Sequence, residues 1–274
     1  MTGFREAARD AGSVEVAVLQ FAATPGDVAG NVSRVVHAVR EHGPGADLVV
    51  APELITTGYD LELVRRRGHE LAEPSDGPSV KQLTVAAMEA DATVVVGFLE
   101  RDDASMLYDS VATITPDGRA SVYRKTHLYP AELDCFTAGQ SLDTVASPAG
   151  VLGPLLCFEH AFPDIATTLA LAGAQILVIP SAVPYGFEHL LELRTRARAQ
   201  DNQVFAVGCN MVGHGFCGRS LVTDPTGDVV VRAGGAETVL RARLDLSAIA
   251  QERAREPALG LRRPELYLPL SDDD

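Results

Sequence analysis

The chain has 274 residues, a length within reach of one large α/β domain. Hydrophobic residues make up 46% and charged residues 22%, so the composition excludes disordered and fibrous classes. With 23 basic and 37 acidic residues the formal net charge is −14, which argues against nucleic acid or an anionic membrane as a partner. Four cysteines are too few for a disulfide scaffold, and the first residues do not resemble a signal peptide. We therefore expect a cytoplasmic protein.

In chain order, apolar runs alternate with helical periods. Strands are predicted over residues 14–21, 46–51, 93–99, 110–115, 120–124, 150–156, 176–179, 204–208, 219–223, 228–232 and 238–244. Helices are predicted over 27–41, from about 77 onward, over 163–172 and over 188–201. Strands and helices alternate early and late, with hairpins between them, which predicts a mixed-sheet α/β fold in layers. We expect one domain over 14–270, a flexible leader at 1–13 and an acidic tail at 271–274.

Three apolar runs each end on a reactive side chain. The run 47–53 ends on Glu53, the run 120–125 ends on Lys125, and the run 150–157 ends on Cys157. In layered α/β folds, functional sites gather where strands end and loops begin. The three side chains are therefore expected to converge.

Each of the three residues has a chemical role and a plainer alternative. Cys157 is a candidate nucleophile, whose pKa a helix start near residue 162 or a cation lowers, or else a buried structural thiol. Glu53, among apolar neighbours, is a candidate general base or one half of an ion pair. Lys125 is a candidate oxyanion stabiliser or a surface lysine. Only Lys81 and Lys125 of the 23 basic residues are lysine, which favours a function for Lys125.

Other site types have weaker support. A cysteine–histidine pair needs a base, and four histidines are available for that role: His127, His160, His189 and His214. Residues 213–218 match G-x-G-x-x-G, but a strand and a turn follow them, so the dinucleotide interpretation fails. Zinc-ligand spacings and a Walker A motif are missing from the sequence. We therefore predict no metal and no cofactor.

The three motifs in this order resemble the nitrilase superfamily of carbon–nitrogen hydrolases, in its amidase-like branch. They read APELITTGYD at 51–60, YRKTHLYPAE at 123–132 and GPLLCFEHAFPD at 153–164. Four further stretches are similar to the family: 169–182, 196–203, 218–230 and 262–267. The resemblance therefore spans about 14–267, nearly the whole chain.

The resemblance implies an α-β-β-α sandwich that forms a homodimer or higher homo-oligomer. It implies Glu53 as general base, Lys125 as electrostatic stabiliser and Cys157 as nucleophile, with the Lys125 ammonium and the Phe158 backbone N–H as the oxyanion hole. It also implies a second glutamate that orients the site. Glu132 matches that position, with Asp134 as the nearby alternative. Arg196 or Arg198, together with Asn202, is expected to support the site structurally.

The implied reaction is hydrolysis of a non-peptide C–N bond in a small-molecule amide, through a thioester, with release of ammonia or an amine. The residues expected to line the substrate pocket are mostly aromatic: Tyr59, Tyr129, His160, Pro184, Tyr185 and Phe187. Phe158-Glu159 lies between the amidase and nitrilase patterns. A nitrile hydrolase, an acyl transferase and a non-catalytic scaffold protein therefore stay open as alternatives.

Overall fold

The computed structural model describes residues 12–267, which form two six-stranded sheets and a small hairpin. The first sheet has the order β14-β1-β2-β3-β4-β5, with β1–β2–β3 parallel and the other pairs antiparallel. Its strands are β1 (Ser13–Gln20), β2 (Leu48–Val50), β3 (Thr93–Arg101), β4 (Leu107–Ile114), β5 (Ala120–Arg124) and β14 (Thr238–Asp245).

The second sheet has the order β13-β12-β9-β8-β7-β6, with β7–β8–β9 parallel. Its strands are β6 (Val145–Ser147), β7 (Gly150–Pro154), β8 (Ile176–Ser181), β9 (Phe205–Asn210), β12 (Leu221–Thr223) and β13 (Val229–Arg232). A two-residue strand β10 (Val212–Gly213) pairs with β11 (Phe216–Cys217) beside it.

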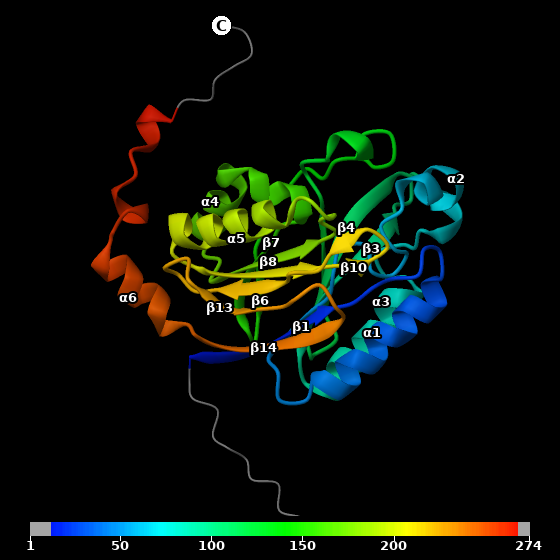
Figure 1. Cartoon of the computed structure of the whole chain (residues 1–274), viewed down its shortest axis with the longest axis horizontal. Helices are drawn as coiled ribbons and strands as arrows, with labels where there is room; N and C mark the ends of the chain where they lie inside the picture. Colours follow the sequence, from blue (N-terminus) through cyan, green and yellow to red (C-terminus); the bar gives the residue numbers. More distant parts are fainter. Residues whose placement is uncertain (1–11, 268–274) are drawn as a thin grey trace, which may run out of the picture.

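The two sheets pack face to face, and helices cover both outer faces (Figure 1). Helices α1 (Val28–His42) and α3 (Pro78–Ala90) share one apolar cluster with the first sheet. Helices α4 (Pro163–Leu171) and α5 (Glu188–Asn202) share another cluster with the second sheet. This layering is the α-β-β-α sandwich that the resemblance implies.

The period of β1 explains why the predicted strands read as continuous apolar runs. Val16 and Val18 pack in the cluster between the sheets, whereas Ala17 and Leu19 pack in the cluster under α1 and α3. Alternate side chains of a strand point to opposite faces, and both faces of this sheet are covered. A central strand in such a sheet has no polar face, so its position is set by hydrophobic burial on both sides.

Several elements differ from the sequence prediction. Helices α2 (Leu61–Leu71) and α6 (Ser247–Arg255), strand β6 and the β10–β11 hairpin were not predicted. Helix α2 buries only Val64, Gly68 and Leu71, and most of its other residues are charged, so few apolar residues were available to indicate a helix. The run predicted as a strand over 150–156 ends at Pro154, and a 3-10 helix, η2 (Cys157–Ala161), follows.

Three other short 3-10 helices occur: η1 (Pro130–Glu132), η3 (Leu259–Leu261) and η4 (Pro264–Leu266). Of the predicted leader 1–13, only Gly12 and Ser13 are described, and Ser13 already belongs to β1. The predicted tail 271–274 lies outside the described residues. Within residues 12–267, every helix is too short or too polar to cross a membrane.

Candidate active site

The structure brings the three predicted strand ends together. Lys125 directly follows β5, whereas Glu53 and Cys157 each lie three residues beyond the ends of β2 and β7. Lys125 Nζ lies 2.6 Å from Glu53 Oε1. Lys125 also lines one cavity together with Cys157, and the charges of both Glu53 and Lys125 act on the Cys157 thiol. The expected convergence of these ends is therefore present.

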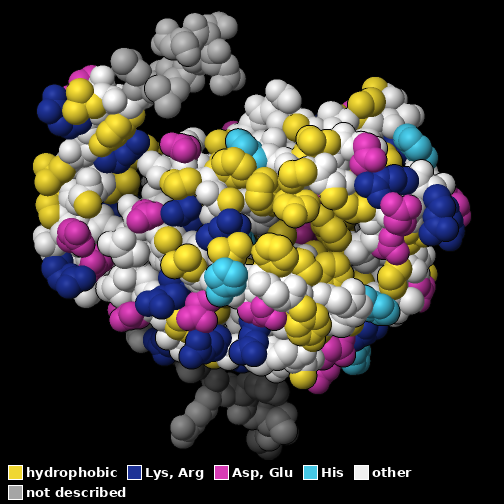
Figure 2. Space-filling model, turned by 45° about the horizontal axis from the view of Figure 1, so that its top comes forward, with side chains coloured by type: hydrophobic (Ala, Val, Ile, Leu, Met, Phe, Trp, Pro, Cys, Tyr) yellow, Lys and Arg dark blue, Asp and Glu magenta, His cyan; other side chains and the backbone are white. Residues whose placement is uncertain are grey.

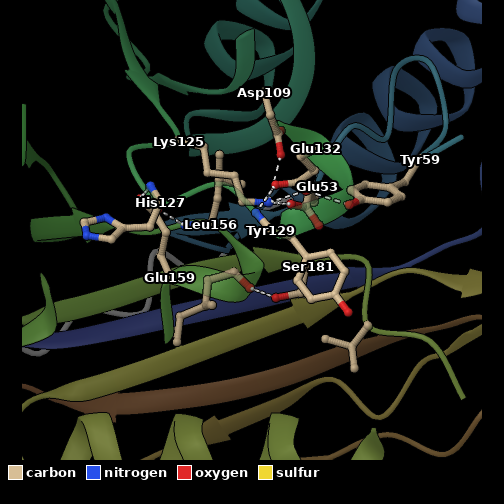
Figure 3. A network of polar contacts seen from close by, with 12 residues as sticks. Glu53, Tyr59, Asp109, Lys125, His127, Tyr129, Glu132, Leu156, Glu159 and Ser181 are labelled. Atoms are coloured by element: carbon tan, nitrogen blue, oxygen red, sulfur yellow. Dashed lines mark hydrogen bonds and ion pairs between the residues drawn. The ribbon is translucent and has the colours of Figure 1, made fainter. Parts of the chain in front are cut away.

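A carboxylate cage surrounds Lys125 at the floor of this cavity (Figure 3). We use this name for Glu53, Asp109 and Glu132. Their oxygens lie 2.6, 3.2 and 2.7 Å from Lys125 Nζ, in that order. All three carboxylates are completely buried, and Lys125 is 1% exposed. The three carboxylates have the spacing of a cation site, and the Lys125 ammonium contacts each of them, so it is the cation of this cluster.

Of the two acidic residues considered for the second glutamate, Glu132 lies in the carboxylate cage and Asp134 does not. Glu132 Oε1 accepts a hydrogen bond of 2.6 Å from Tyr59 Oη, and Glu132 Oε2 accepts one of 2.7 Å from the Tyr129 N–H. Asp134 instead pairs with Arg65 on the surface. Because the chain turns at η1, Glu132 lies in the buried cage while Asp134, only two residues later, lies on the protein surface.

Asp109 belongs to the cage and was missed by the sequence analysis. It lies in β4, where its carbonyl accepts a hydrogen bond of 2.9 Å from the Lys125 N–H, so Asp109 lies opposite the residue that directly follows the neighbouring strand β5. The predicted strand began only at Ser110. An acidic residue inside the apolar run 107–114 is the signal that could have identified it, because an unpaired buried carboxylate is costly.

The backbone at Cys157 adopts a left-handed conformation, with φ of 42°, at the start of η2. The Ala182 N–H contacts its sulfur through a hydrogen bond that favours the thiolate. Nevertheless, burial and then the charge of Glu53 raise the pKa of Cys157 well above its ordinary value, against the opposing effect of Lys125. The expected lowering of this pKa is therefore wrong. These effects favour the protonated thiol over the thiolate.

Glu159 ties together the loops that carry Lys125 and Cys157. Its carboxylate accepts hydrogen bonds from the Thr126 N–H (2.7 Å), the Leu156 N–H (2.6 Å) and Tyr123 Oη (2.7 Å). Figure 3 shows Glu159 below the cage, on the side of the second sheet. Glu159 is fully buried and does not line the cavity. Its identity as glutamate therefore concerns loop positioning rather than direct contact with a substrate.

The cavity has a volume of about 400 Å³ and mostly apolar walls. Of the residues expected to line it, five do so: Tyr59, Tyr129, His160, Pro184 and Phe187. Phe158 and Phe216 add two further aromatic rings. Tyr185 does not line it, because the chain turns at Gly186 and leaves the Tyr185 side chain 59% exposed. Figure 2 shows hydrophobic side chains gathered around a hollow in the surface, with charged side chains mostly around them.

His160 is the histidine at the cavity, and it is not suited to act as a base. Among the described residues His127, His189 and His214 do not line this cavity. Burial, followed by the charges of Arg194 and Arg198, lowers the pKa of His160 to about 3. An imidazole with such a pKa takes up protons poorly at neutral pH. The cysteine–histidine alternative therefore lacks a suitable partner here.

Of the two arginines expected to support the site, Arg198 lies next to a residue of the cavity wall. It is nearly buried, and its Nη1 donates a hydrogen bond of 3.2 Å to the His160 carbonyl. Asn202 Nδ2 donates in turn to the Arg198 carbonyl at 2.9 Å. Arg196 is half exposed and reaches the Gly227 carbonyl instead, away from the cavity.

Comparisons with known proteins show which family this chain belongs to. The model of the carbon–nitrogen hydrolase family matches residues 15–254. A protein of Pseudomonas protegens described as "Hydrolase in pqqF 5'region" is 36% identical over 94% of this chain and 92% of its own length. An (R)-stereoselective amidase of Pseudomonas sp. is 34% identical over 88% of each chain.

A solved structure shows the same fold. Saccharomyces cerevisiae Nit3, a member of branch 10 of the nitrilase superfamily, superposes with a TM-score of 0.83 at 28% identity. The match covers 92% of this chain and 96% of Nit3. With the family model spanning the sandwich and its cage, this chain belongs to the carbon–nitrogen hydrolase family, in the amidase-like branch of the nitrilase superfamily.

Proposed function

We propose that this enzyme is a cysteine-dependent amidohydrolase that cleaves a small amide through a thioester on Cys157. The observation that carries the proposal is the juxtaposition at the cavity floor. A buried ammonium on Lys125 is hydrogen-bonded to Glu53 and Glu132 and lines the same cavity as the Cys157 thiol. Such a group offers a nucleophile, a base and a fixed positive charge at one place.

In the proposed first half-reaction, Glu53 accepts the thiol proton as Cys157 Sγ attacks the carbonyl carbon of the amide. The Lys125 ammonium and the Phe158 N–H stabilise the negative oxygen of the tetrahedral intermediate. The C–N bond then breaks, and the proton held by Glu53 passes to the leaving nitrogen. Ammonia or an amine departs and a thioester is left.

In the second half-reaction, water attacks the thioester carbon while Glu53 accepts one of the water protons. The C–S bond breaks, the carboxylic acid leaves, and the proton returns to Cys157. Glu53 does not line the cavity, whereas Glu132 does. Glu132 therefore faces the cavity and orients Lys125, while Glu53 exchanges protons with the Cys157 thiol, on which its charge acts.

The residues of the cavity wall indicate the chemical character of the acyl group. They are mostly apolar, but Arg194 on α5 also lines the cavity. Among residues 12–267 no carboxylate pairs with Arg194, and its Nη1 lies 3.4 Å from His160 Nε2. Because a guanidinium only donates, His160 Nε2 is the acceptor and the proton sits on Nδ1, a buried atom without a partner among the described residues.

The Arg194 guanidinium is thus left to bind a ligand, whereas His160 Nδ1 is buried and closed to one. We propose that the preferred amide has an apolar acyl chain that ends in an acceptor group, a carboxylate above all. The test compares primary amides of equal chain length with and without a terminal carboxylate. Wild type should prefer the carboxylate form, and Arg194→Met should lose that preference. Equal preference in both proteins would remove Arg194 from the substrate site.

The function itself is tested by release of ammonia or amine from primary amides, carbamoyl amines and nitriles, with Cys157→Ala as the matched control. Release from amides by the wild type alone supports the proposal. Release from nitriles alone indicates a nitrile hydrolase, and a product that carries an added amine acceptor indicates an acyl transferase. Equal release by Cys157→Ala contradicts the proposal. Absence of release from every compound would leave either a substrate outside the panel or a scaffold role.

A further inference from the structure

The carboxylate cage holds more acidic groups than its cation can balance. Glu53, Asp109 and Glu132 surround the single ammonium of Lys125, and all four residues are 0–1% exposed. If all three carboxyl groups were ionised, two negative charges would be uncompensated in a space from which water is excluded. Buried charges without a partner are very costly, so such a cluster takes up a proton instead.

The hydrogen bonds indicate where this proton resides. Glu132 has donors on both oxygens, from Lys125 and Tyr59 on Oε1 and from Tyr129 on Oε2. Glu53 has a short bond from Lys125 on Oε1, at 2.6 Å. Asp109 has only the longest of the three Lys125 contacts, at 3.2 Å on Oδ2. Its ionised form is therefore the least stabilised of the three.

Two oxygens of the cage are left without a donor. Glu53 Oε2 and Asp109 Oδ1 are both buried and unpaired when both groups are taken as carboxylates. One oxygen of each side chain lies within 4.8 Å of one of the other, and each carboxyl group acts on the pKa of the other through a hydrogen bond. One proton between them satisfies both atoms at once, and two interacting carboxyl groups commonly share a proton in this way.

We propose that Asp109 is a protonated carboxylic acid in the resting enzyme and donates a hydrogen bond from Oδ1 to Glu53 Oε2, which keeps Glu53 ionised and oriented as the base. Burial raises the pKa of Asp109 well above its ordinary value, and the charges of Glu53 and Glu132 raise it further against Lys125. Asp109 is then a positioning residue that acts through Glu53. This role rests on the proposed function, whereas the protonation state does not.

The protonation state is tested by infrared spectroscopy at neutral pH, through the carbonyl stretch of a protonated carboxylic acid. We expect this band in the wild type and its loss in Asp109→Asn. The matched control is Asp134→Asn, because the Arg65 guanidinium lowers the pKa of Asp134 and keeps it ionised. Absence of the band from the wild type, or its persistence in Asp109→Asn, overturns the proposal whether or not an amide substrate has been found.

The positioning role is tested by kinetics. The asparagine amide has the shape of the protonated acid and can donate the same hydrogen bond to Glu53 Oε2. We therefore expect Asp109→Asn to keep kcat within about tenfold of the wild type and Asp109→Ala to lose about 100-fold. We also expect the alkaline fall of kcat/KM to move to higher pH in Asp109→Asn, since an amide does not lose its proton there. Equal loss in both variants, with folding verified by circular dichroism, overturns the role.

Discussion

The floor and the rim of the cavity differ in the polarity and in the burial of their side chains. The floor consists of ionisable side chains that are almost completely buried and bonded to one another, with Lys125 at 1% exposure among three carboxylates. The rim consists of aromatic side chains open to solvent, such as Tyr129 at 45% and Phe187 at 48%. The comparison teaches that the proposed reacting groups are held in place by charge, whereas the proposed substrate contacts are apolar surfaces that stay hydrated until a ligand binds.

The sharpest contrast is between the two lysines of the chain. Lys125→Met removes the cation of the cage and leaves its carboxylates unpaired, so the free energy of unfolding should fall by about 3–5 kcal/mol. Lys81→Met is the control, because Lys81 is 70% exposed in its pair with Asp76 and should change stability by no more than about 0.5 kcal/mol. Chemical denaturation measures both. A small loss for Lys125→Met would mean that the cage does not need its cation.

A second prediction concerns Glu159, which joins the loops that carry Lys125 and Cys157. In Glu159→Gln one acceptor oxygen becomes a donor that faces the Leu156 or Thr126 N–H, so the free energy of unfolding should fall by about 1–3 kcal/mol. The exposed glutamate Glu265, paired with Arg263, is the matched control for the same substitution. If the two variants have equal stability, the loops do not depend on this carboxylate.

A third prediction concerns His160 in the cavity wall and how the free energy of unfolding depends on pH. Below pH 6.5 the unfolded chain protonates His160, while the folded chain does not until about pH 3. The unfolded state then binds more protons, so this residue makes the free energy of unfolding fall as the pH drops through that window. His160→Asn should therefore lose less stability than the wild type between about pH 7 and about pH 4. Parallel losses would mean that His160 titrates normally.

The smallest expected effect separates two neighbouring aromatic residues of the rim. Phe187 lines the cavity and Tyr185 does not, although both are about half exposed. Phe187→Ala should raise KM about fivefold through roughly 1 kcal/mol of lost apolar contact, with kcat little changed. Tyr185→Ala should leave both constants near wild type. A larger effect at Tyr185 would place the substrate further out than the cavity indicates.

The site residues that could be predicted from sequence differ from those that could not in their place along the strands. Glu53, Lys125 and Cys157 could be found because each ends an apolar run, and strand ends meet at one edge of the sandwich. Asp109 could not be found in that way, because it lies within a strand and its role depends on what surrounds it. The pKa of Cys157 also depends on burial by distant segments, which local sequence does not report.

Much of the fold followed from periodicity, because central strands buried on both faces and amphipathic helices such as α1 give strong patterns. The elements that were not predicted have few apolar residues or are very short. Helix α2 buries only a narrow side, and β10 and β11 have two residues each. The prediction that Tyr185 lines the cavity was wrong for a different reason, because the direction of its side chain depends on the turn at Gly186.

The most direct test of the account is to trap the acyl-enzyme. The wild type is mixed with a primary amide that it hydrolyses, quenched in acid, and analysed by intact-protein and peptide mass spectrometry. We predict an added acyl group on Cys157 and on none of the other three cysteines, with no addition in Cys157→Ala. Hydrolysis of the amide by Cys157→Ala at the wild-type rate, or an acyl group on Cys135, Cys209 or Cys217 in place of Cys157, would contradict the account.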